Sequence, residues 1–453
     1  MHRGDRPRHR GPVHRGQSPR TPAPEGARLA GRRHGQWDPI PRLADRPVLR
    51  QALVLGASVP DHLHRVCSRA RAVSDLIYLD YNATTPLDRR VLAAMRPYLE
   101  DAFGNAASRH HRLGCAASGA VERAREQVAS LIGADPREIV WTSGATESNN
   151  LALKGLAAAA AYDGRRHVVT VRTEHHAVID PCRWLETQGF EVTWLAVDER
   201  GQIDLDALDA AIRDDTLVVS VMHANNEVGT LHPVPEIGRR CRARGVLFHT
   251  DATQSVGKEP VDVEAGCIDL LSFSAHKMYG PKGSGGLYVR RRGPRVRLEP
   301  IIHGGGHERG ARSGTLNVPG IVGLGAAAEL CAAEMDAERA RVAGLRDRLQ
   351  SAVVTALPHT VVNGDGAPRL AGTLNVSFPG VDAEALLRRL PDLCVSTASA
   401  CTSAAVQPSH VLGALGLDDD LLLGSVRLSA GRFTTEDEID RAATALVDAV
   451  NAS

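Results

Sequence analysis

The chain contains an aspartate and a lysine that are placed as they would be in a catalytic site. Asp251 and Lys277 lie 26 residues apart, and each follows a short apolar stretch, residues 246–250 and 269–273, that predicts a buried strand. Side chains at the carboxyl ends of parallel strands face the ligand crevice. Burial and a neighbouring cation lower the pKa of a lysine, which frees its amine to form a Schiff base. Taken singly, Asp251 also fits a structural acid, and Lys277 also fits an exposed loop lysine.

A second pattern, between a predicted strand and a predicted helix, is suited to phosphate. Residues 142–149 read TSGATESN and are mostly small, so a ligand can approach the backbone closely. The helix start presents unpaired N–H groups and the positive end of the helix dipole, and the Thr146 hydroxyl adds a donor. An N-cap with nothing bound is the alternative. The sequence has no Walker motif, which disfavours an ATP-binding loop.

Together these features predict a site for pyridoxal phosphate (PLP). This cofactor needs a phosphate-binding loop, an acid that pairs with its ring nitrogen and a lysine that holds it covalently. The carboxylate of Asp251 would keep the ring nitrogen protonated, so that the ring accepts the electron pair left on the substrate Cα. The order of phosphate loop, Asp251 and Lys277 is typical of aminotransferase-like PLP enzymes, and the combination is far more specific than any one part.

Cys401 lies in a segment that suits a nucleophile. Residues 395–405 read VSTASACTSAA, a run of small residues that is too polar for a core. A cysteine in such a loop would be exposed and mobile. The other seven cysteines mostly fall in helix or strand patterns and fit small buried hydrophobes. Because no C-x-x-C pair or zinc-type spacing occurs, we expect no metal site, free thiols and a reducing compartment, the cytoplasm.

The order of the predicted elements indicates an α/β fold. Short apolar strands alternate with amphipathic helices, which implies a mostly parallel sheet covered on both faces. The predicted strands are residues 139–141, 167–171, 192–197, 217–223, 246–250, 269–273 and 286–290. The helices predicted between them include residues 121–132, 149–160 and 205–212.

After Thr315 the pattern changes to that of a smaller α+β domain. A long helix is predicted over residues 321–357, and the elements after it are strands at 373–378, 393–396 and 425–429 and helices at 383–390 and 436–451. The expected division of the chain is an N-terminal extension over 1–72, a large PLP-binding domain over 73–320 and a small domain with the cysteine loop over 321–453. Residues 73–95 are a candidate to pack on the small domain.

Composition and charge exclude several classes of protein. The 453 residues are 43% hydrophobic and 24% charged, as in globular proteins, and the longest apolar runs fall short of the ~18 residues of a membrane helix. Residues 1–72 hold 15 Arg, no Lys and five acids, a net charge of +10 that leaves −9 for residues 73–453. This extension has no periodicity and predicts disorder. Three interpretations fit it: a transit peptide, a nucleic-acid-binding arm, or a start site placed too early. A transit peptide would place the protein in mitochondria. We favour the third interpretation, with translation from near Val73.

Several segments together resemble the cysteine desulfurases, in particular the long-loop type that supplies sulfur for iron–sulfur clusters and thiolated tRNA. The resemblance runs from about Leu76 to Asp440 and rests on residues 78–86 (YLDYNATTP), 142–149, 174–175, 225–227, 251–254, 274–283, 303–315 and 399–403. It implies a homodimer of the aminotransferase-like, fold type I architecture. It also implies L-cysteine as substrate, with L-alanine and an enzyme persulfide as products.

The resemblance further implies a role for individual residues. Lys277 would hold PLP covalently, Asp251 would pair with the ring nitrogen, and Cys401 would accept the sulfur. Four residues would bind the phosphate: Ala145, Thr146, Ser274 and His276. Thr315 would reach the phosphate of the partner subunit's cofactor.

Other implied roles concern the cofactor ring and the substrate. Asn226 and Gln254 would contact the ring oxygen, and His175 would stack on the ring and assist proton transfer. Arg427, with Asn105 nearby, would hold the substrate carboxylate.

Two other functions are compatible with parts of the sequence. A selenocysteine lyase or a sulfinate lyase on the same fold would use the same PLP groups and could also employ Cys401. Nucleic-acid binding rests on residues 1–72 alone, without an accompanying fold motif. As partners we therefore expect sulfur-acceptor proteins, such as an iron–sulfur scaffold or tRNA-thiolation proteins, and neither a membrane nor nucleic acid.

Overall fold

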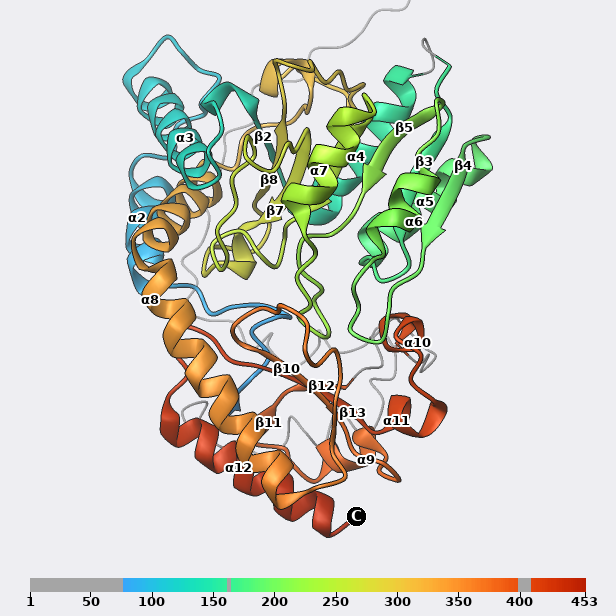
Figure 1. Cartoon of the computed structure of the whole chain (residues 1–453). Helices are drawn as coiled ribbons and strands as arrows, with labels where there is room; N and C mark the ends of the chain where they lie inside the picture. Colours follow the sequence, from blue (N-terminus) through green and yellow to red (C-terminus); the bar gives the residue numbers. More distant parts are fainter. Residues whose placement is uncertain (1–75, 161–163, 398–408) are drawn as a thin grey trace, which may run out of the picture. The chain divides into compact units, whose positions relative to one another are not determined.

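The computed structural model describes residues 76–160, 164–397 and 409–453 (Figure 1). The extension expected over residues 1–72 and the loop around Cys401 lie outside these residues. Within the described part, a large sheet and a smaller sheet each carry their own hydrophobic core. The α/β architecture predicted from the sequence is confirmed.

The larger sheet has seven strands and is mostly parallel. β3 to β7 run parallel to one another, and β8 runs antiparallel to both β7 and β2. The order along the sheet is β2 (Ile139–Thr142), β8 (Gly285–Val289), β7 (Leu270–Ser274), β6 (Leu247–Asp251), β5 (Thr216–Ser220), β3 (His167–Val171) and β4 (Glu191–Leu195). Each predicted strand corresponds to one of these seven, although the strand predicted over residues 217–223 already ends at Ser220.

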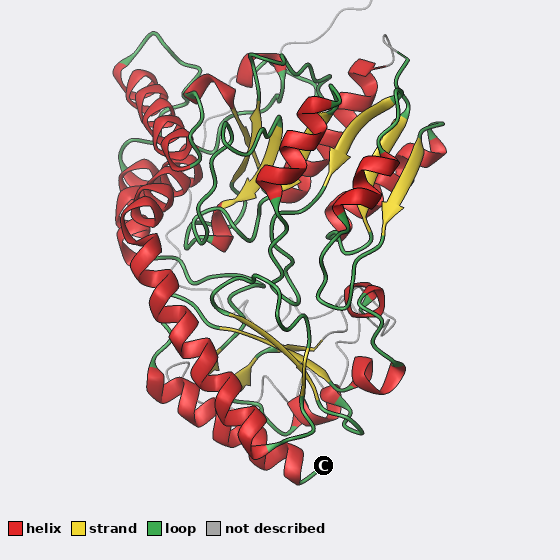
Figure 2. Ribbon diagram, viewed as in Figure 1, coloured by secondary structure: helices red, strands yellow, loops and turns green. Residues whose placement is uncertain are grey.

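Both faces of this sheet are buried because its strands are apolar on both sides. Val168 and Val218 belong to the core on one face, whereas Val169 and Val219, the next residues along the same strands, belong to the core on the other. The helices of the first face are α4 (Ala145–Ala160) and α5 (His176–Thr187). Those of the second are α2 (Arg89–Glu100), α3 (Arg112–Leu131), α6 (Leu205–Ala211), α7 (Val234–Ala243) and the first half of α8 (Val318–Ala356). Figure 2 shows the helices flanking the strands.

The smaller sheet is antiparallel and is built from the C-terminal part of the chain. Its order is β12 (Ser396–Thr397), β13 (Ser425–Ser429), β10 (Thr373–Ser377) and β9 (Val361–Val362). A separate parallel pair joins β1 (Ile77–Tyr78) to β11 (Leu393–Cys394). The helices that pack in the same core are α9 (Ala383–Arg388), the second half of α8 and α12 (Glu436–Asn451). Two short helices, α10 (His410–Ala414) and α11 (Asp419–Leu423), precede β13.

The 39-residue helix α8 contributes to both cores. Ile321 and Leu324 pack in the core of the large sheet, and Leu345 and Leu349 pack in the core of the small sheet. Among the described residues α8 is the one helix long and apolar enough to cross a membrane, and half of that apolar stretch is buried inside the protein. Counting uninterrupted apolar runs misses it because Gly and Glu break those runs. The domain boundary expected at residue 320 falls within this helix and stays a prediction.

Candidate active site

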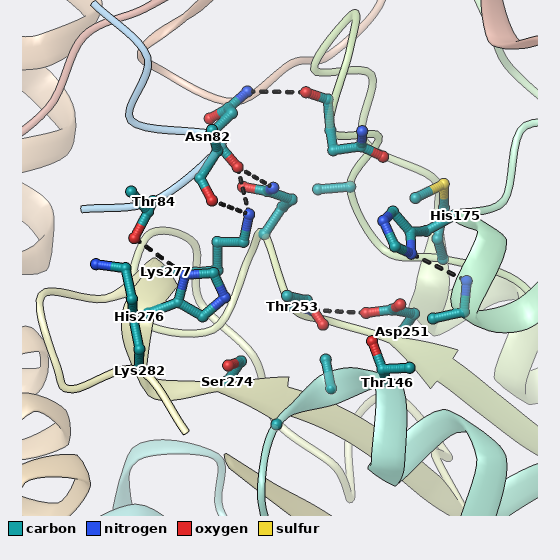
Figure 3. Close-up of a pocket in the computed structure, with 18 of the residues that line it drawn as sticks. Asn82, Thr84, Thr146, His175, Asp251, Thr253, Ser274, His276, Lys277 and Lys282 are labelled. Atoms are coloured by element: carbon teal, nitrogen blue, oxygen red, sulfur yellow. Dashed lines mark hydrogen bonds between the residues drawn. The ribbon is translucent and has the colours of Figure 1, made fainter. Parts of the chain in front are cut away.

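The carboxyl ends of β6 and β7, the first turns of α4 and α5 and the loop after β1 line a cavity of about 660 Å³. This volume is typical of small-molecule sites, which span ~300–1,000 Å³. Ten of the residues predicted for the site line it: Ala145, Thr146, His175, Asn226, Asp251, Gln254, Ser274, His276, Lys277 and Arg427. Figure 3 shows Lys277 within this space, with Thr146 and Ser274 along one side and His175 and Asp251 along another.

Lys277 ends the short turn that follows β7 directly. Its Nζ donates hydrogen bonds to the backbone carbonyl oxygens of Asn82, at 2.5 Å, and Ala83, at 2.8 Å. Burial, followed by the positive charges of Lys258 and Arg427, lowers the pKa of Lys277 to about 7. About half of the amine is therefore neutral near pH 7, the form that acts as a nucleophile or base.

Asp251 is the buried last residue of β6, and its orientation is fixed by two hydrogen bonds. Its Oδ2 accepts from the side-chain amide of Asn149 at 2.7 Å, and its Oδ1 accepts from the backbone N–H of Thr253 at 2.9 Å. The acid predicted to pair with a ring nitrogen thus stands at the edge of the sheet that faces the cavity.

His175 caps the start of α5 and lines the same cavity. Its Nδ1 accepts the backbone N–H of Ala177 at 3.0 Å, so the proton of the neutral ring sits on Nε2. Burial, opposed in part by the charge of Asp251, lowers the pKa of His175. The ring is therefore neutral at physiological pH and has one fixed tautomer.

The start of α4 forms a site for an anion. Gly144 has a φ of 155°, which side chains rarely adopt, and a Cβ there would stand 3.6 Å from Ser274 Oγ. The backbone can therefore turn tightly and present the N–H groups around Thr146 to the cavity. Glu147, in the first turn, is neutralised by an ion pair with Arg312 at 2.8 Å.

His276 and Lys282 add polar groups to this end of the cavity. The Nδ1 of His276 lies 3.2 Å from Thr84 Oγ1. Burial, together with the charges of Lys277 and Lys282, lowers the pKa of His276 to about 4. His276 therefore acts as a neutral hydrogen-bonding group, and Lys282 supplies a positive charge for a bound phosphate.

Arg427, on β13, brings a guanidinium from the small sheet to the cavity wall. Its Nη2 donates to Asp80 Oδ1 at 2.7 Å and to Ser396 Oγ at 2.9 Å, and its Nη1 donates to the carbonyl oxygen of Asn226 at 3.0 Å. Its Nε is buried without a hydrogen-bond partner in the described part of the chain. The guanidinium that borders the cavity suits the carboxylate of a substrate.

Asn82 is a site residue to which the sequence assigns no role. It is only 4% exposed and is held by bonds from its N to Ser429 Oγ, at 3.0 Å, and from its Nδ2 to Thr373 Oγ1, at 2.9 Å. Its carbonyl oxygen accepts from both Lys277 Nζ and Gln254 Nε2, the latter at 2.9 Å. No sequence signal could show this contact, because a backbone carbonyl makes it and every residue type has one.

Two of the predicted residues do not line this cavity. Thr315 is exposed on the surface. Asn105 is also exposed, and its Oδ1 accepts the backbone N–H of Ala107 at 2.9 Å. Cys401 lies outside the described residues. The roles of all three stay predictions.

Comparison with known proteins identifies the family. The model of the class-V aminotransferases matches residues 77–442. The cysteine desulfurase IscS of Anaeromyxobacter sp. (strain Fw109-5) is 58% identical over 375 residues, which cover 83% of this chain and 92% of that protein. The chain belongs to the cysteine desulfurase family. The IscS of Shewanella sp. (strain ANA-3) is 55% identical to this desulfurase over 377 residues, 83% of this chain and 93% of that protein.

Solved structures agree with the assignment of this chain to the cysteine desulfurase family. A NifS-like protein superposes with a TM-score of 0.77 at 38% identity, over 83% of this chain and 100% of that chain. SspA in complex with cysteine superposes with a TM-score of 0.69 at 37% identity, over 79% of this chain and 99% of that chain. The aminotransferase-like fold predicted from the sequence is thereby confirmed.

The desulfurase uses PLP, as predicted, and the residues of its cavity fit this cofactor. The start of α4 and Ser274 suit the phosphate, Asp251 suits the ring nitrogen, and Lys277 suits the covalent bond. The hydroxyl of Thr253, which lines the cavity, is buried without a hydrogen-bond partner in the described residues and would gain one from a polar ligand. Within residues 76–160, 164–397 and 409–453, no cluster of His, Cys, Asp or Glu could hold a metal ion.

Proposed function

We propose that this desulfurase takes sulfur from L-cysteine, releases L-alanine and keeps the sulfur as a persulfide on Cys401. The observation that carries the proposal is the meeting of Lys277, Asp251 and Arg427 in one cavity at the start of a helix. An amine, an acid and a guanidinium are the groups that PLP and the carboxylate of an amino acid require. The relative SspA, solved in complex with cysteine, supports the choice of substrate.

Lys277 acts as the base of the reaction. Its Nζ, with a pKa of about 7, is neutral often enough at physiological pH to remove the proton from the substrate Cα. When bound, PLP takes up the electron pair that this proton removal leaves on Cα. The carbonyl oxygens of Asn82 and Ala83 accept from Nζ and hold it in one position.

Asp251 and His175 assist from the cavity wall. The Asp251 carboxylate is oriented by Asn149 and Thr253 and would keep a proton on the ring nitrogen of the bound cofactor. His175 carries its own proton on Nε2 because Nδ1 is occupied by the N–H of Ala177. It can therefore donate from Nε2 to an oxygen or sulfur in the cavity that it lines.

Cys401 completes the sulfur transfer. Its thiolate attacks the substrate sulfur, an S–S bond forms, and the substrate C–S bond breaks. The electron pair of the broken bond stays with the carbon skeleton, which takes up one proton at Cβ and one at Cα, in place of the proton that Lys277 removed, and leaves as L-alanine. The persulfide then passes to an acceptor protein, and we propose an iron–sulfur scaffold or a tRNA-thiolation protein, since the curated relatives are IscS desulfurases.

The proposed enzyme is a homodimer in which Thr315 reaches the phosphate of the partner subunit's cofactor. The exposure of Thr315 supports this arrangement. Apolar side chains at the end of α2 and the start of α3 are also exposed, by 57% for Leu99, 72% for Phe103 and 39% for Leu113. Large apolar side chains that are exposed in one subunit are available for burial in an interface. Light scattering of the purified protein should give twice the 48.4 kDa of the chain.

The test of the function is a spectrum and a product assay on the purified protein. Bound PLP gives a visible absorption band, and L-cysteine should change that band and yield L-alanine with equimolar persulfide. Mass spectrometry should place the added sulfur on the peptide that contains Cys401. Release of alanine from L-cysteine sulfinate or L-selenocysteine, but none from L-cysteine, would instead support the alternative lyases.

A further inference from the structure

A second lysine, Lys258, lies behind the wall of the active-site cavity. It lines a separate cavity of about 40 Å³, together with Tyr279 and Glu338 among others. Asn82 lines both this cavity and the active-site cavity, so one residue borders both spaces. The chemistry proposed above does not use Lys258.

Hydrogen bonds connect Lys258 to Lys277. The Nζ of Lys258 donates to Gln254 Oε1 at 3.1 Å, and Gln254 Nε2 donates to the carbonyl oxygen of Asn82 at 2.9 Å. The same carbonyl oxygen accepts from Lys277 Nζ at 2.5 Å. One backbone oxygen thus links the two lysines, with the Gln254 amide between it and Lys258.

The contact with Lys258 determines which way the Gln254 amide points. An ammonium group has only donors, so the atom it contacts must be the amide oxygen. The amide nitrogen is thereby turned toward the carbonyl oxygen of Asn82. Asn82 is itself held in place by its hydrogen bonds to Ser429 and Thr373. Gln254 therefore has one N–H left as a donor for a ligand in the cavity that it lines, while its oxygen is engaged by Lys258.

The charge of Lys258 is not cancelled by an ion pair within the described residues. The acids nearest to it are already engaged: Glu259 pairs with Arg339 at 2.8 Å, and Glu338 pairs with Arg432 at 2.7 Å. Two other groups face Lys258: Cys331, which lies on α8 as Glu338 does, and Arg427 on β13. Burial lowers the pKa of Lys258 to about 8. After burial, the positive charge of Lys258 is the largest cause of the lowered pKa of Lys277.

We propose that Lys258 is a positioning residue of the reaction, which fixes the amide of Gln254 from behind and places a second positive charge next to Lys277. This inference deepens the proposed function and rests on Lys277 as the residue that binds the cofactor. Its consequence is that the amine of Lys277 gives up its proton at lower pH than it would without Lys258, while Gln254 stays a donor toward the oxygen of the cofactor ring.

The test compares the holoenzymes of four proteins: the wild type, Lys258→Met, Lys258→Arg and Lys154→Met. Lys154 is a matched control because its amine packs on the Trp184 ring, 4.8 Å from the centroid, and does not line the active-site cavity. The readout is the pH midpoint at which the visible band of the bound cofactor changes, recorded together with the acidic limb of the pH profile for alanine formation.

In Lys258→Met we expect both midpoints to rise by on the order of 1 pH unit, because a like charge beside the cofactor-binding amine has been removed. Lys258→Arg keeps the charge and the donors, and its midpoints should stay near those of the wild type, as should those of Lys154→Met. Unchanged midpoints in Lys258→Met, or an equal rise in Lys258→Arg, would overturn the proposal.

Two further outcomes are informative. If Lys258→Met binds no cofactor, Lys258→Arg decides: wild-type midpoints support the proposal, and shifted midpoints or loss of the cofactor overturn it. Failure of the proposed function can be distinguished from failure of this proposal by a Lys277→Ala protein. If Lys277 does not bind the cofactor, that protein would keep the same pH-dependent visible band.

Discussion

The Nη2 of Arg427 lies 2.7 Å from the Oδ1 of Asp80, so the guanidinium at the cavity wall already has a carboxylate partner from the other end of the described chain. Both side chains are largely buried, at 11% and 18% exposure. Ser396 Oγ donates to the same Asp80 oxygen at 3.0 Å. Asp80 therefore holds Arg427 in place before any substrate arrives.

Replacement of Arg427 should weaken substrate binding more than it slows the chemistry. Arg427→Lys keeps the charge but loses the planar set of donors, and we expect the KM for L-cysteine to rise about 10- to 100-fold, the loss of a charge-assisted hydrogen bond of ~1.5–3 kcal/mol. Asp80→Asn should raise KM less. The control is Arg348→Lys, an exposed residue paired with Asp440, which should leave KM unchanged. Steady-state kinetics with L-cysteine measure all three, and a wild-type KM in Arg427→Lys would show that Arg427 does not bind the carboxylate.

Asp251→Asn should retain PLP but lose most of the activity. The amide can still bond to Asn149, but it cannot hold a proton on the ring nitrogen as a carboxylate does. We expect kcat to fall at least ~100-fold, about 2.7 kcal/mol of barrier, at unchanged cofactor content. The exposed Asp180→Asn on α5 is the control. Near-normal turnover by Asp251→Asn would remove Asp251 from its assigned role.

The rate at which apoenzyme takes up PLP should depend on pH through Lys277. Only the neutral amine attacks the aldehyde of the cofactor, and burial lowers the pKa of Lys277 from 10.5 to about 7. Because deprotonation increases with pH, the rate should rise from pH 6 to pH 8 around a midpoint near 7 and then level off. Stopped-flow absorbance records this profile. A rate that keeps rising to pH 10 would mean that the pKa of the Lys277 amine is not lowered.

Cys401→Ser should separate the two halves of the reaction. Binding of L-cysteine needs Lys277 and Arg427 but no thiol, so the spectral response to substrate should survive. A hydroxyl is far less acidic than a thiol, whose usual pKa is ~8.5, and it cannot hold a persulfide. Alanine formation and protein-bound sulfur should therefore be lost. The exposed Cys115→Ser is the matched control and should retain both. Alanine release at the wild-type rate from Cys401→Ser would rule out Cys401 as the sulfur acceptor.

The sequence predicts those parts of the fold that depend on local patterns. The strand β3 and the helix α12 have the predicted bounds, because their apolar periodicity and flanking turns coincide. The strand predicted over residues 217–223 runs three residues too far, since the apolar run continues into the segment that enters the active-site cavity, which Met222 lines. These residues are buried by the packing of other parts of the chain, and in the sequence such an apolar run looks the same as the continuation of a strand.

The candidate site divides in the same way. Asp251 and Lys277 could be found because they follow strands, and the topology of a parallel sheet brings strand ends together. Asn82 and Asp80 could not be assigned roles, because their positions depend on contacts with residues about 300 or more positions later in the chain: Thr373 and Ser429 for Asn82, and Arg427 for Asp80. Lys258 gives no signal either, because its partner Gln254 lies four residues earlier in a segment without helical periodicity.

The pairing of β1 with β11 has a consequence for synthesis of the protein. Ile77 and Leu79 are buried in the core of the small sheet, alongside Leu428 of β13, which leaves the ribosome some 350 residues later. At 5–20 residues per second, roughly 20–70 seconds separate the two. During that time the strands of the large sheet can already pair, while the segment that carries Asn82 waits without its partners. The wall of the pocket that Asn82 and Arg427 form is therefore completed only after β13 has emerged, and the full set of groups for the cofactor comes together at that point.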